Sequence, residues 1–381
     1  MKTSFYQNRE QTEVKHRALE RYLQAFVPIV GTWASDIVYV DCLAGPWKAE
    51  GQNLEDTSFY KAISVLREAK HALSKRGKNP SFRCLLIDNR PEAFAELKTF
   101  ASSIAEINVE ARDWDFSSSV QKIVGFVKER PNTFPFIFID PTGWELAAVN
   151  LITPLLQLKP GEVLINLMTS WITRFLTDET KPFEKLVGGN VGRLRQLNGE
   201  DLEDELVSCY TAAVRSAGKF RYACSLPILK AAHDAIHFYL IYGTRHVRGV
   251  EVFKEMEKTV ISFMHETRAE AQSRKKFEKS GGQYTFLTPE ESYSEKRFSR
   301  LHEKNSEAVR GKLLNALQTK GSILYDDIWG ACMQYPTLTE ADLRSWLQHW
   351  KESQLIEILN APANQRFPKR KTDQIIKWIG G

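Results

Sequence analysis

The chain has 381 residues and a formal net charge of +5, and 43% of its residues are hydrophobic. This length exceeds one typical core, so we expect one large domain and a smaller one, and no apolar run approaches the roughly 20 residues that span a bilayer. The five cysteines form no Cys-x-x-Cys pair, and the first residues contain no apolar signal core. We therefore predict a folded cytoplasmic protein with no membrane segment, no disulfide framework and no metal site.

The most informative local pattern follows a helix and a short strand near the start of the chain. Residues 11–28 have the periodicity of an amphipathic helix, with Lys15 among the charged residues of its polar side. The apolar run at 38–40 then ends in Asp41 and in a turn whose small residues let the backbone approach a ligand closely. S-adenosylmethionine-dependent methyltransferases commonly carry Asp-x-Phe-Ala-Gly-x-Gly here, and this segment resembles it except that Trp47 replaces the last glycine. We predict S-adenosylmethionine as the cofactor, contacted by Asp41, Leu43, Ala44 and Gly45; the alternative is an ordinary turn after a buried strand.

Strands and helices then alternate along the chain. Apolar runs predict strands at 84–88, 107–111, 136–140 and 163–168, and amphipathic patterns predict helices at 57–73, 91–102, 117–129 and 147–157. Strands at 221–227 and 237–243 are too close in sequence for a parallel crossover, so we expect an antiparallel hairpin, followed by a helix at 249–274. The fold class is α/β, with a doubly wound Rossmann-like methyltransferase sheet.

Two acidic residues after later strands are candidates for binding the adenosine part of the cofactor. Asp88 ends the second strand, where doubly wound folds place a carboxylate that accepts hydrogen bonds from ribose hydroxyls. Asp113 follows the third strand, where an acid next to Trp114 could hold an adenine. The alternative in both places is a capped or charged helix entry.

The segment from Asp140 to Trp144 is the candidate reaction centre. Methyltransferases that act on amino groups of bases place an acid or amide, two prolines and an aromatic ring at this strand end, where the acid accepts a hydrogen bond from the amine and the ring stacks on the base. Catalysis there is positioning and electrostatics. We predict Asp140, Pro141 and Trp144 as catalytic residues; Thr142 replaces the second proline, and the alternative is a structural turn that borders the cofactor.

The chain changes character after the predicted sheet. We expect a methyltransferase-like domain over 1–272, a linker or insertion over 273–300, and a winged-helix-like domain over 301–381. Its three helices contain Val309 to Leu317, Ile323 to Ile328, and a stretch that begins at Thr339, and a hairpin pairs 355–359 with 365–368.

Basic residues of this last domain are candidates for contacting nucleic acid. The third helix would enter a major groove of the nucleic acid, and the basic wing would hold phosphates. Winged helices also serve as protein-interaction modules, which is the alternative. The predicted contacts are Arg344, Gln348, Lys351, Arg366, Lys369, Arg370 and Lys371.

Four motifs together resemble the three-Cys-motif partner proteins, or TcmP. They are KHRALERYL at 15–23, YVDCLAGP at 39–46, FIDP at 138–141 and FYLIYGTR at 238–245. The resemblance implies a methyltransferase-like fold with a winged-helix tail and a partner that looks like a radical S-adenosylmethionine protein with three cysteines. It puts Asp41 and Gly45 at the methionine moiety, Asp88 at the ribose and Asp140 at the reaction centre.

The resulting hypothesis is an S-adenosylmethionine-dependent methyltransferase-like protein that acts on the amino group of a base in DNA or RNA. The alternative is a non-catalytic partner protein that keeps the fold and binds DNA or a radical S-adenosylmethionine-like protein through its C-terminal domain. A nuclease using Asp41, Asp88 and Asp140 around a metal is disfavoured, because no lysine accompanies these acids in a recognisable pattern.

Overall fold

A computed structural model of the chain describes residue 6 and residues 9–45, 54–169, 181–189, 191–280, 296–362 and 364–380. The chain divides into two compact units, Met1–Ser294 and Glu295–Gly381, and each is described by itself. No helix within the described ranges is both long and apolar enough to cross a membrane.

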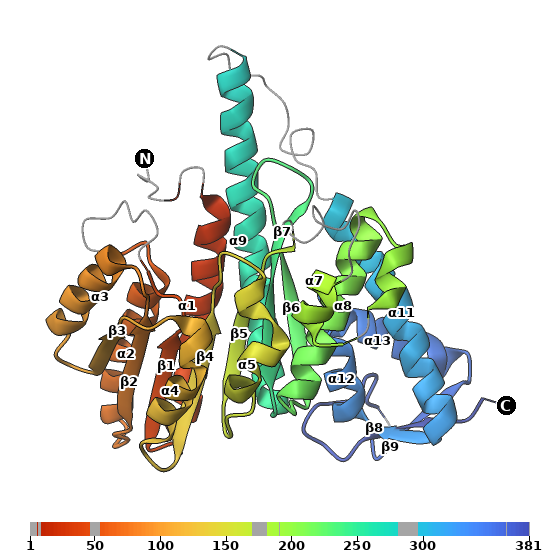
Figure 1. Cartoon of the computed structure of the whole chain (residues 1–381). Helices are drawn as coiled ribbons and strands as arrows, with labels where there is room; N and C mark the ends of the chain where they lie inside the picture. Colours follow the sequence, from red (N-terminus) through yellow and green to blue (C-terminus); the bar gives the residue numbers. More distant parts are fainter. Residues whose placement is uncertain are drawn as a thin grey trace. The chain divides into compact units, whose positions relative to one another are not determined.

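A seven-stranded sheet forms the centre of the first unit (Figure 1). Its spatial order is β3-β2-β1-β4-β5-β7-β6, in which β1 to β5 are parallel and β7 runs antiparallel to both neighbours. The strands are β1 (Asp36–Asp41), β2 (Ser81–Ile87), β3 (Asn108–Arg112), β4 (Thr133–Ile139), β5 (Glu162–Leu167), β6 (Tyr222–Leu229) and β7 (Ile236–Thr244). The mostly parallel α/β sheet confirms the predicted class and is consistent with a Rossmann-like methyltransferase fold, and the predicted antiparallel hairpin is confirmed as β6 and β7.

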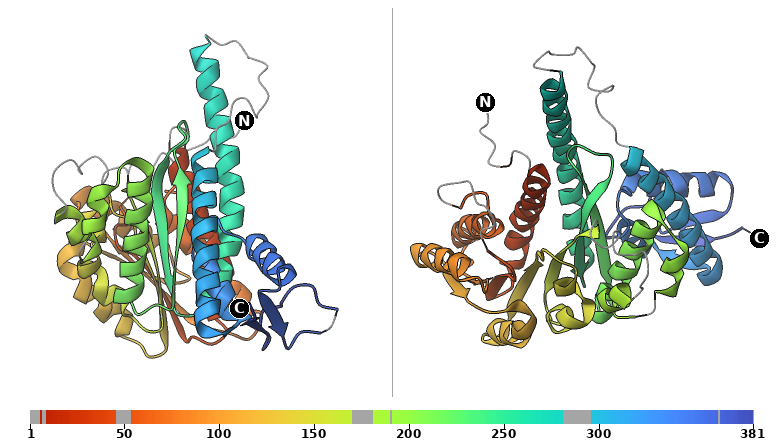
Figure 2. Two further views of the ribbon diagram at one scale, coloured as in Figure 1. Left: turned by 90° about the vertical axis from the view of Figure 1, so that its right-hand side faces the viewer. Right: turned by 45° about the horizontal axis from the view of Figure 1, so that its top comes forward.

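Helices cover both faces of this sheet, which is why its strands are continuous apolar runs. On one face α1 (Glu10–Val30) packs between α2 (Ser58–Ser74) and α9 (Val247–Lys279), and on the other face α5 (Val149–Leu156) packs between α4 (Phe116–Lys128) and α8 (Gly199–Ala217). The other helices of this unit within the described ranges are α3 (Pro91–Ser103), α7 (Lys181–Val187) and the short 3₁₀ turns η1 (Glu145–Ala147) and η2 (Gly192–Gln196). Figure 2 shows the end of α9 rising beyond the sheet, and this helix continues past residue 272, where we placed the start of a linker.

The second unit consists of helices and a small antiparallel sheet in the order β8-β10-β9. Its elements are α11 (Lys296–Lys320), β8 (Ser322–Leu324), α12 (Tyr325–Met333), α13 (Glu340–Glu352), β9 (Ile356–Leu359) and β10 (Ile375–Trp378). The side chain of Thr339 accepts from Asp342 N and the Asp342 side chain accepts from Thr339 N, so the predicted cap of α13 is present. This capping box fixes where the helix begins.

Two details of the second unit differ from the sequence-based expectation. Ile323 and Leu324 belong to strand β8 rather than to a helix. The partner of β9 is β10, rather than residues 365–368. The latter residues lie in the loop 360–374, where side chains replace strand pairing: the Gln365 amide donates to Gln374 Oε1 at 2.8 Å, and Lys369 N donates to the same oxygen at 2.7 Å.

Candidate functional site

The order of the strands reverses between β1 and β4, which lie side by side although β2 and β3 come between them in sequence. In open α/β sheets, the carboxyl ends of the strands at such a switch point form the usual ligand crevice. Asp41 is the last residue of β1, Asp140 follows β4, and Asp88 follows β2. The structure therefore brings these three predicted acids to one edge of the sheet, here called the carboxyl edge.

Asp41 is completely buried, and its described partners are neutral. It accepts hydrogen bonds from Ser58 Oγ at 2.8 Å, Tyr39 OH at 3.0 Å and Leu43 N at 3.4 Å. Burial raises the pKa of Asp41 from 3.8 to about 6, the negative charge of Asp140 adds to the rise, and the hydrogen bonds from Ser58 and Tyr39 oppose it. A buried carboxylate that lacks a cation beside it favours the approach of a positive group.

Asp140 is held by two side chains from other elements. Asn166 Nδ2, near the end of β5, donates to Asp140 Oδ1 at 2.7 Å, and Lys15 Nζ of α1 forms an ion pair with Asp140 Oδ2. The Lys15 ammonium also lies 5.8 Å from the centre of the Phe238 ring. Asp140 is thus a paired acid whose oxygens are oriented by Asn166 and Lys15.

Lys15 lies beside Asp140, although we assigned it to the polar side of its helix, and that assignment was wrong. Its side chain is 12% exposed. Lys15, Leu19, Tyr22 and Phe26 follow the i, i+4, i+7, i+11 spacing of one helix face, and the last three are buried. This spacing was the signal in the sequence, because a lysine that continues an apolar stripe needs a buried partner.

Asp88 is paired with Arg90, and the pair lies against the predicted cofactor turn. Arg90 donates through Nε to Asp88 Oδ1 at 3.0 Å and through Nη2 to Oδ2 at 2.7 Å. A Cβ on Gly45 would lie 1.9 Å from both Asp88 Oδ2 and Arg90 Nη2. While Asp88 and Arg90 keep these positions only glycine fits at residue 45, and Arg90, which sequence reasoning missed, occupies the space in front of the turn. Ala44 N donates to Ile87 O at 2.8 Å, which ties the turn to β2.

The other candidates at this edge are more peripheral. Asp113 is exposed, and its neighbour Asp115 caps α4 by accepting from Ser118 N at 3.0 Å. Pro141 is buried, and Trp144 is half-buried at the start of η1. Trp47 lies outside the described residues. Among the described residues, no group of three or more His, Cys, Asp or Glu side chains could hold a metal ion, although a lysine does accompany Asp140.

The candidate nucleic-acid contacts of the second unit fall into two groups. Arg344 and Lys351 on α13, and Arg366, Lys369 and Lys371 in the loop 360–374, are exposed, and Gln348 is half-buried. Arg370 is different: its side chain is 13% exposed, its Nε donates to Asp326 Oδ1 at 2.6 Å, and its guanidinium lies 3.7 Å from the centre of the Trp329 ring. Arg370 therefore anchors the loop to α12.

Comparison with known proteins adds little to this geometry. No protein-family model matches the chain, and no curated protein matches it in sequence. Solved structures that are similar include protein LPL1258 of Legionella pneumophila strain Philadelphia 1, described under the family DUF519, with 10% identity, a TM-score of 0.38, and coverage of 65% of this chain and 91% of that one. A loganic acid methyltransferase with SAH has 10% identity, a TM-score of 0.30, and coverage of 74% and 92%. At these scores the likeness carries no functional assignment.

Proposed function

We propose that this chain is an S-adenosylmethionine-dependent methyltransferase-like protein that acts on the amino group of a nucleic-acid base. The observation that carries the proposal is Asp41, a fully buried acid at the switch point whose pKa is raised to about 6 and whose described partners are neutral. S-adenosylmethionine carries positive charge on its sulfonium and its ammonium group. A cation near Asp41 would offset the cost of burying this carboxylate.

The residues at the carboxyl edge fit this cofactor if Arg90 moves. The turn at Ala44 and Gly45 borders Asp88, which follows β2, and this position supports the proposal that Asp88 holds the ribose hydroxyl pair. Arg90 fills that space, but its side chain is 38% exposed and can swing outward. When bound, the cofactor supplies a methyl group activated on sulfur; the chain supplies the binding and the orientation.

Asp140 is proposed to orient the amine that accepts the methyl group. A carboxylate has about four lone-pair sites, so Asp140 can accept a hydrogen bond from an amine while Asn166 and Lys15 hold its two oxygens. Trp144 lies at the start of η1, in the segment that follows this acid, and its ring would stack on the base. These groups position the nitrogen for attack, which is the main contribution such a site makes.

Nucleic acid is the proposed substrate because of the second unit. Its order of helix, strand, two helices and two strands supports a winged-helix fold, in which the loop 360–374 is the wing. Exposed cations lie on α13 and on this wing, where they could hold phosphates.

A non-catalytic partner protein is the second candidate, and a specific observation favours it. Arg90 satisfies Asp88 and Lys15 satisfies Asp140, so two of the three acids already have cations. A fold that has lost its cofactor would fill its site in this way. A radical S-adenosylmethionine-like protein with three cysteines is the proposed partner in that case.

Calorimetric titration with S-adenosylmethionine at millimolar concentration separates the two candidates. We expect binding by the wild type, binding at least threefold tighter in Arg90→Ala because the guanidinium no longer competes, and weaker binding in Asp41→Asn. Arg67→Ala, which removes an exposed arginine paired with Glu106, is the matched control and should bind as the wild type does. In Asp140→Ala, methyl transfer to DNA or RNA should vanish while the cofactor still binds. No heat from either the wild type or Arg90→Ala would favour the non-catalytic partner.

The proposed wing can be tested by the salt dependence of DNA affinity. Each lost phosphate contact lowers the slope of log K against log salt by about 0.9. The double variant Lys369→Ala, Lys371→Ala should lower this slope by up to about twice that amount, since it removes up to two phosphate contacts. Lys377→Ala, at an exposed position on β10, should leave the slope unchanged. An equal change of slope in the double variant and in Lys377→Ala would refute a specific contact between the wing and DNA.

A further inference from the structure

A cavity of about 420 Å³ lies at the opposite edge of the same sheet. It is lined by the second half of α1, the first residues of β4 and β5, the end of β7 and the first turns of α9. Because β4 and β5 begin here, this is the amino edge, away from Asp41, Asp88 and Asp140. The volume lies within the range of small-molecule sites, which is roughly 300–1,000 Å³.

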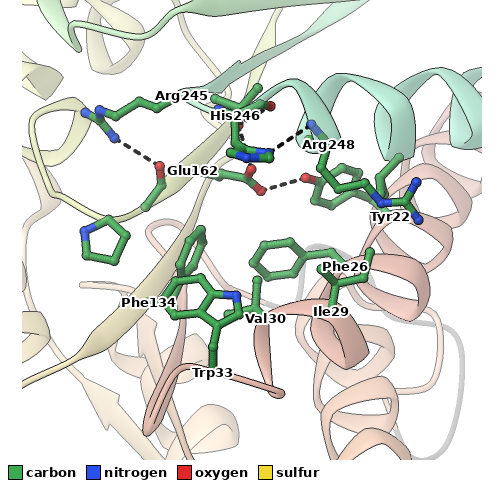
Figure 3. A pocket seen from close by; sticks show the side chains of 15 residues that line it. Tyr22, Phe26, Ile29, Val30, Trp33, Phe134, Glu162, Arg245, His246 and Arg248 are labelled. Atoms are coloured by element: carbon green, nitrogen blue, oxygen red, sulfur yellow. Dashed lines mark hydrogen bonds between the residues drawn. The ribbon is translucent and has the colours of Figure 1, made fainter. Parts of the chain in front are cut away.

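One side of the cavity is aromatic. Figure 3 shows Phe26, Trp33 and Phe134 gathered on that side. Trp33 meets Phe134 edge to face at 5.6 Å between ring centres, and Phe26 lies 5.2 Å from Phe134. Trp33 is 50% exposed, although it is one of the largest apolar side chains of the protein. A ligand body seated here would remove this apolar surface from water, which is favourable in proportion to its area.

The opposite side is polar and contains donors beside one lining acid, Glu162. Glu162 is engaged, because it accepts from Tyr22 OH at 2.6 Å and from Thr244 Oγ1 at 2.7 Å. His246 Nδ1 accepts from Arg248 N at 3.1 Å, which leaves Nε2 as the ring nitrogen that carries the proton. Figure 3 shows Glu162 and His246 across the cavity from the aromatic side, while the Arg248 side chain extends to one side of them, past Tyr22.

Two arginines complete the electropositive side. Arg245 donates through Nη1 and Nη2 to main-chain carbonyls, including Leu158 O and Gly161 O, while its buried Nε has no hydrogen-bond partner among the described residues. Arg248 is 42% exposed and pairs with Glu251. Burial raises the pKa of Glu162, and hydrogen bonds from Tyr22 and Thr244 oppose the rise. A negative head group is the complement of this set of donors.

We propose that this cavity binds a small amphipathic carboxylate, with its apolar ring or chain on Phe26, Trp33 and Phe134 and its carboxylate near His246 and Arg248. The sheet separates this site from the carboxyl edge, and the inference does not depend on the proposed methyl transfer. The aromatic side selects the body of the ligand, and the donors select the charge of its head.

Three probes with one ring system test both halves of the proposal on the full chain. They are 2-naphthoate, 2-naphthylmethanol and 2-naphthylmethylamine, followed by calorimetry and by the shift in thermal midpoint. We expect 2-naphthoate to bind below millimolar concentration, the alcohol at least tenfold more weakly, and the amine not measurably. Equal or tighter binding of the amine, or no binding of any probe at millimolar concentration, would overturn the proposal.

Variants assign the two ends of the ligand. Arg248→Gln should weaken the carboxylate about tenfold and leave the alcohol unchanged, whereas Trp33→Ala should weaken both. Trp33 is half exposed, so its loss leaves the fold intact and avoids the ambiguity of a filled core position. Arg193→Gln, at an arginine that is 81% exposed, is the control for the charge. Unchanged affinity of 2-naphthoate in both Arg248→Gln and Trp33→Ala would place the probe elsewhere and refute the assignment.

Discussion

Strand β1 begins and ends with a buried aspartate, and the two are held in opposite ways. Asp36 is 2% exposed and Asp41 is fully buried. Burial alone would raise the pKa of Asp36, but hydrogen bonds from Arg83, Ser81 and Thr133 hold it below its ordinary value. At the other end of the strand, five residues away, burial raises the pKa of Asp41 to about 6, the charge of Asp140 adds to the rise, and the hydrogen bonds from its neutral partners do not offset it.

The difference separates a structural acid from a candidate functional one. Arg83, which is 1% exposed, donates to Asp36 Oδ2 at 2.8 Å and links the start of β1 to β2 and α4. Asp41 forms no comparable ion pair with the residues that the structure describes, and its charge costs free energy in the folded protein. Groups that are kept despite such a cost cluster at functional sites. Both acids have little or no exposed surface, and an ion pair with a cation is a feature of Asp36 that the described contacts of Asp41 do not include.

The largest effect should follow from removing the structural acid. Asp36→Ala leaves the Arg83 guanidinium buried without its main partner, so we expect about 3–5 kcal/mol of lost stability in urea unfolding. Glu129 is the other acid that pairs with Arg83, and its side chain is 58% exposed. Glu129→Ala should therefore lower the free energy of unfolding by less than about 1 kcal/mol. Because the pKa of Asp36 is lowered by folding, its stabilisation is present above pH 3.8 and is lost as the pH falls through the folded value. Equal losses in the two variants would erase the contrast.

Replacing Asp41 should have an effect of opposite sign. Its folded pKa of about 6 exceeds the ordinary 3.8, so the folded state binds the proton more tightly and the wild type loses stability as the pH rises from 4 to 6, by about 3 kcal/mol. Asp41→Asn carries no charge there, so this slope should flatten and the variant should be more stable than the wild type at pH 8. Unfolding curves at pH 4, 6 and 8 measure the free energy of unfolding of both proteins. If its decrease with pH were the same in Asp41→Asn as in the wild type, the contrast between Asp36 and Asp41 would be wrong.

The smallest effect concerns the influence of one acid on the other. The negative charge of Asp140 raises the pKa of Asp41, after burial. Asp140→Asn should lower the pKa of Asp41 by about one unit or less, since the interaction acts between partly screened groups. Carbon-detected NMR titration of the Asp41 carboxyl group measures this, with Asp88→Asn as the comparison variant. A rise in the Asp41 pKa would contradict the prediction, because removal of the Asp140 charge can only favour the charged form of Asp41.

Local periodicity was sufficient to predict the sheet, and the strand-end acids followed from it. Runs such as Phe136 to Ile139 are apolar over the length of one strand, and Asp140 follows directly. Pairings between distant residues were not accessible. Lys15 meets Asp140 across 125 positions, and Arg90 covers Gly45 from the next βα connection. No local pattern specifies such a contact, although the position of Lys15 on the apolar stripe of α1 indicated that it needed one.

The amino-edge cavity was not predicted at all, for a related reason. Phe26, Phe134 and Val252 look like ordinary core residues in the sequence, and the cavity exists only because α1 and α9 leave space beside the first residues of β4 and β5.

The hairpin in the second unit was misassigned because the pattern at 365–368 resembles a short strand. Pairing with β8 and β9 instead favoured the apolar residues Ile375 and Ile376.

Helix α1 and strand β5 each reach from one edge of the sheet to the other. On α1, Lys15 pairs with Asp140 and Tyr22 donates to Glu162, seven residues or about 10 Å along the axis. On β5, Glu162 lies beside the cavity and Asn166 donates to Asp140, about 13 Å along the strand. The two edges are therefore connected by one helix and one strand: α1 contacts Asp140 near its start and Glu162 seven residues later, and β5 contains Glu162 at its start and contacts Asp140 through Asn166 near its end.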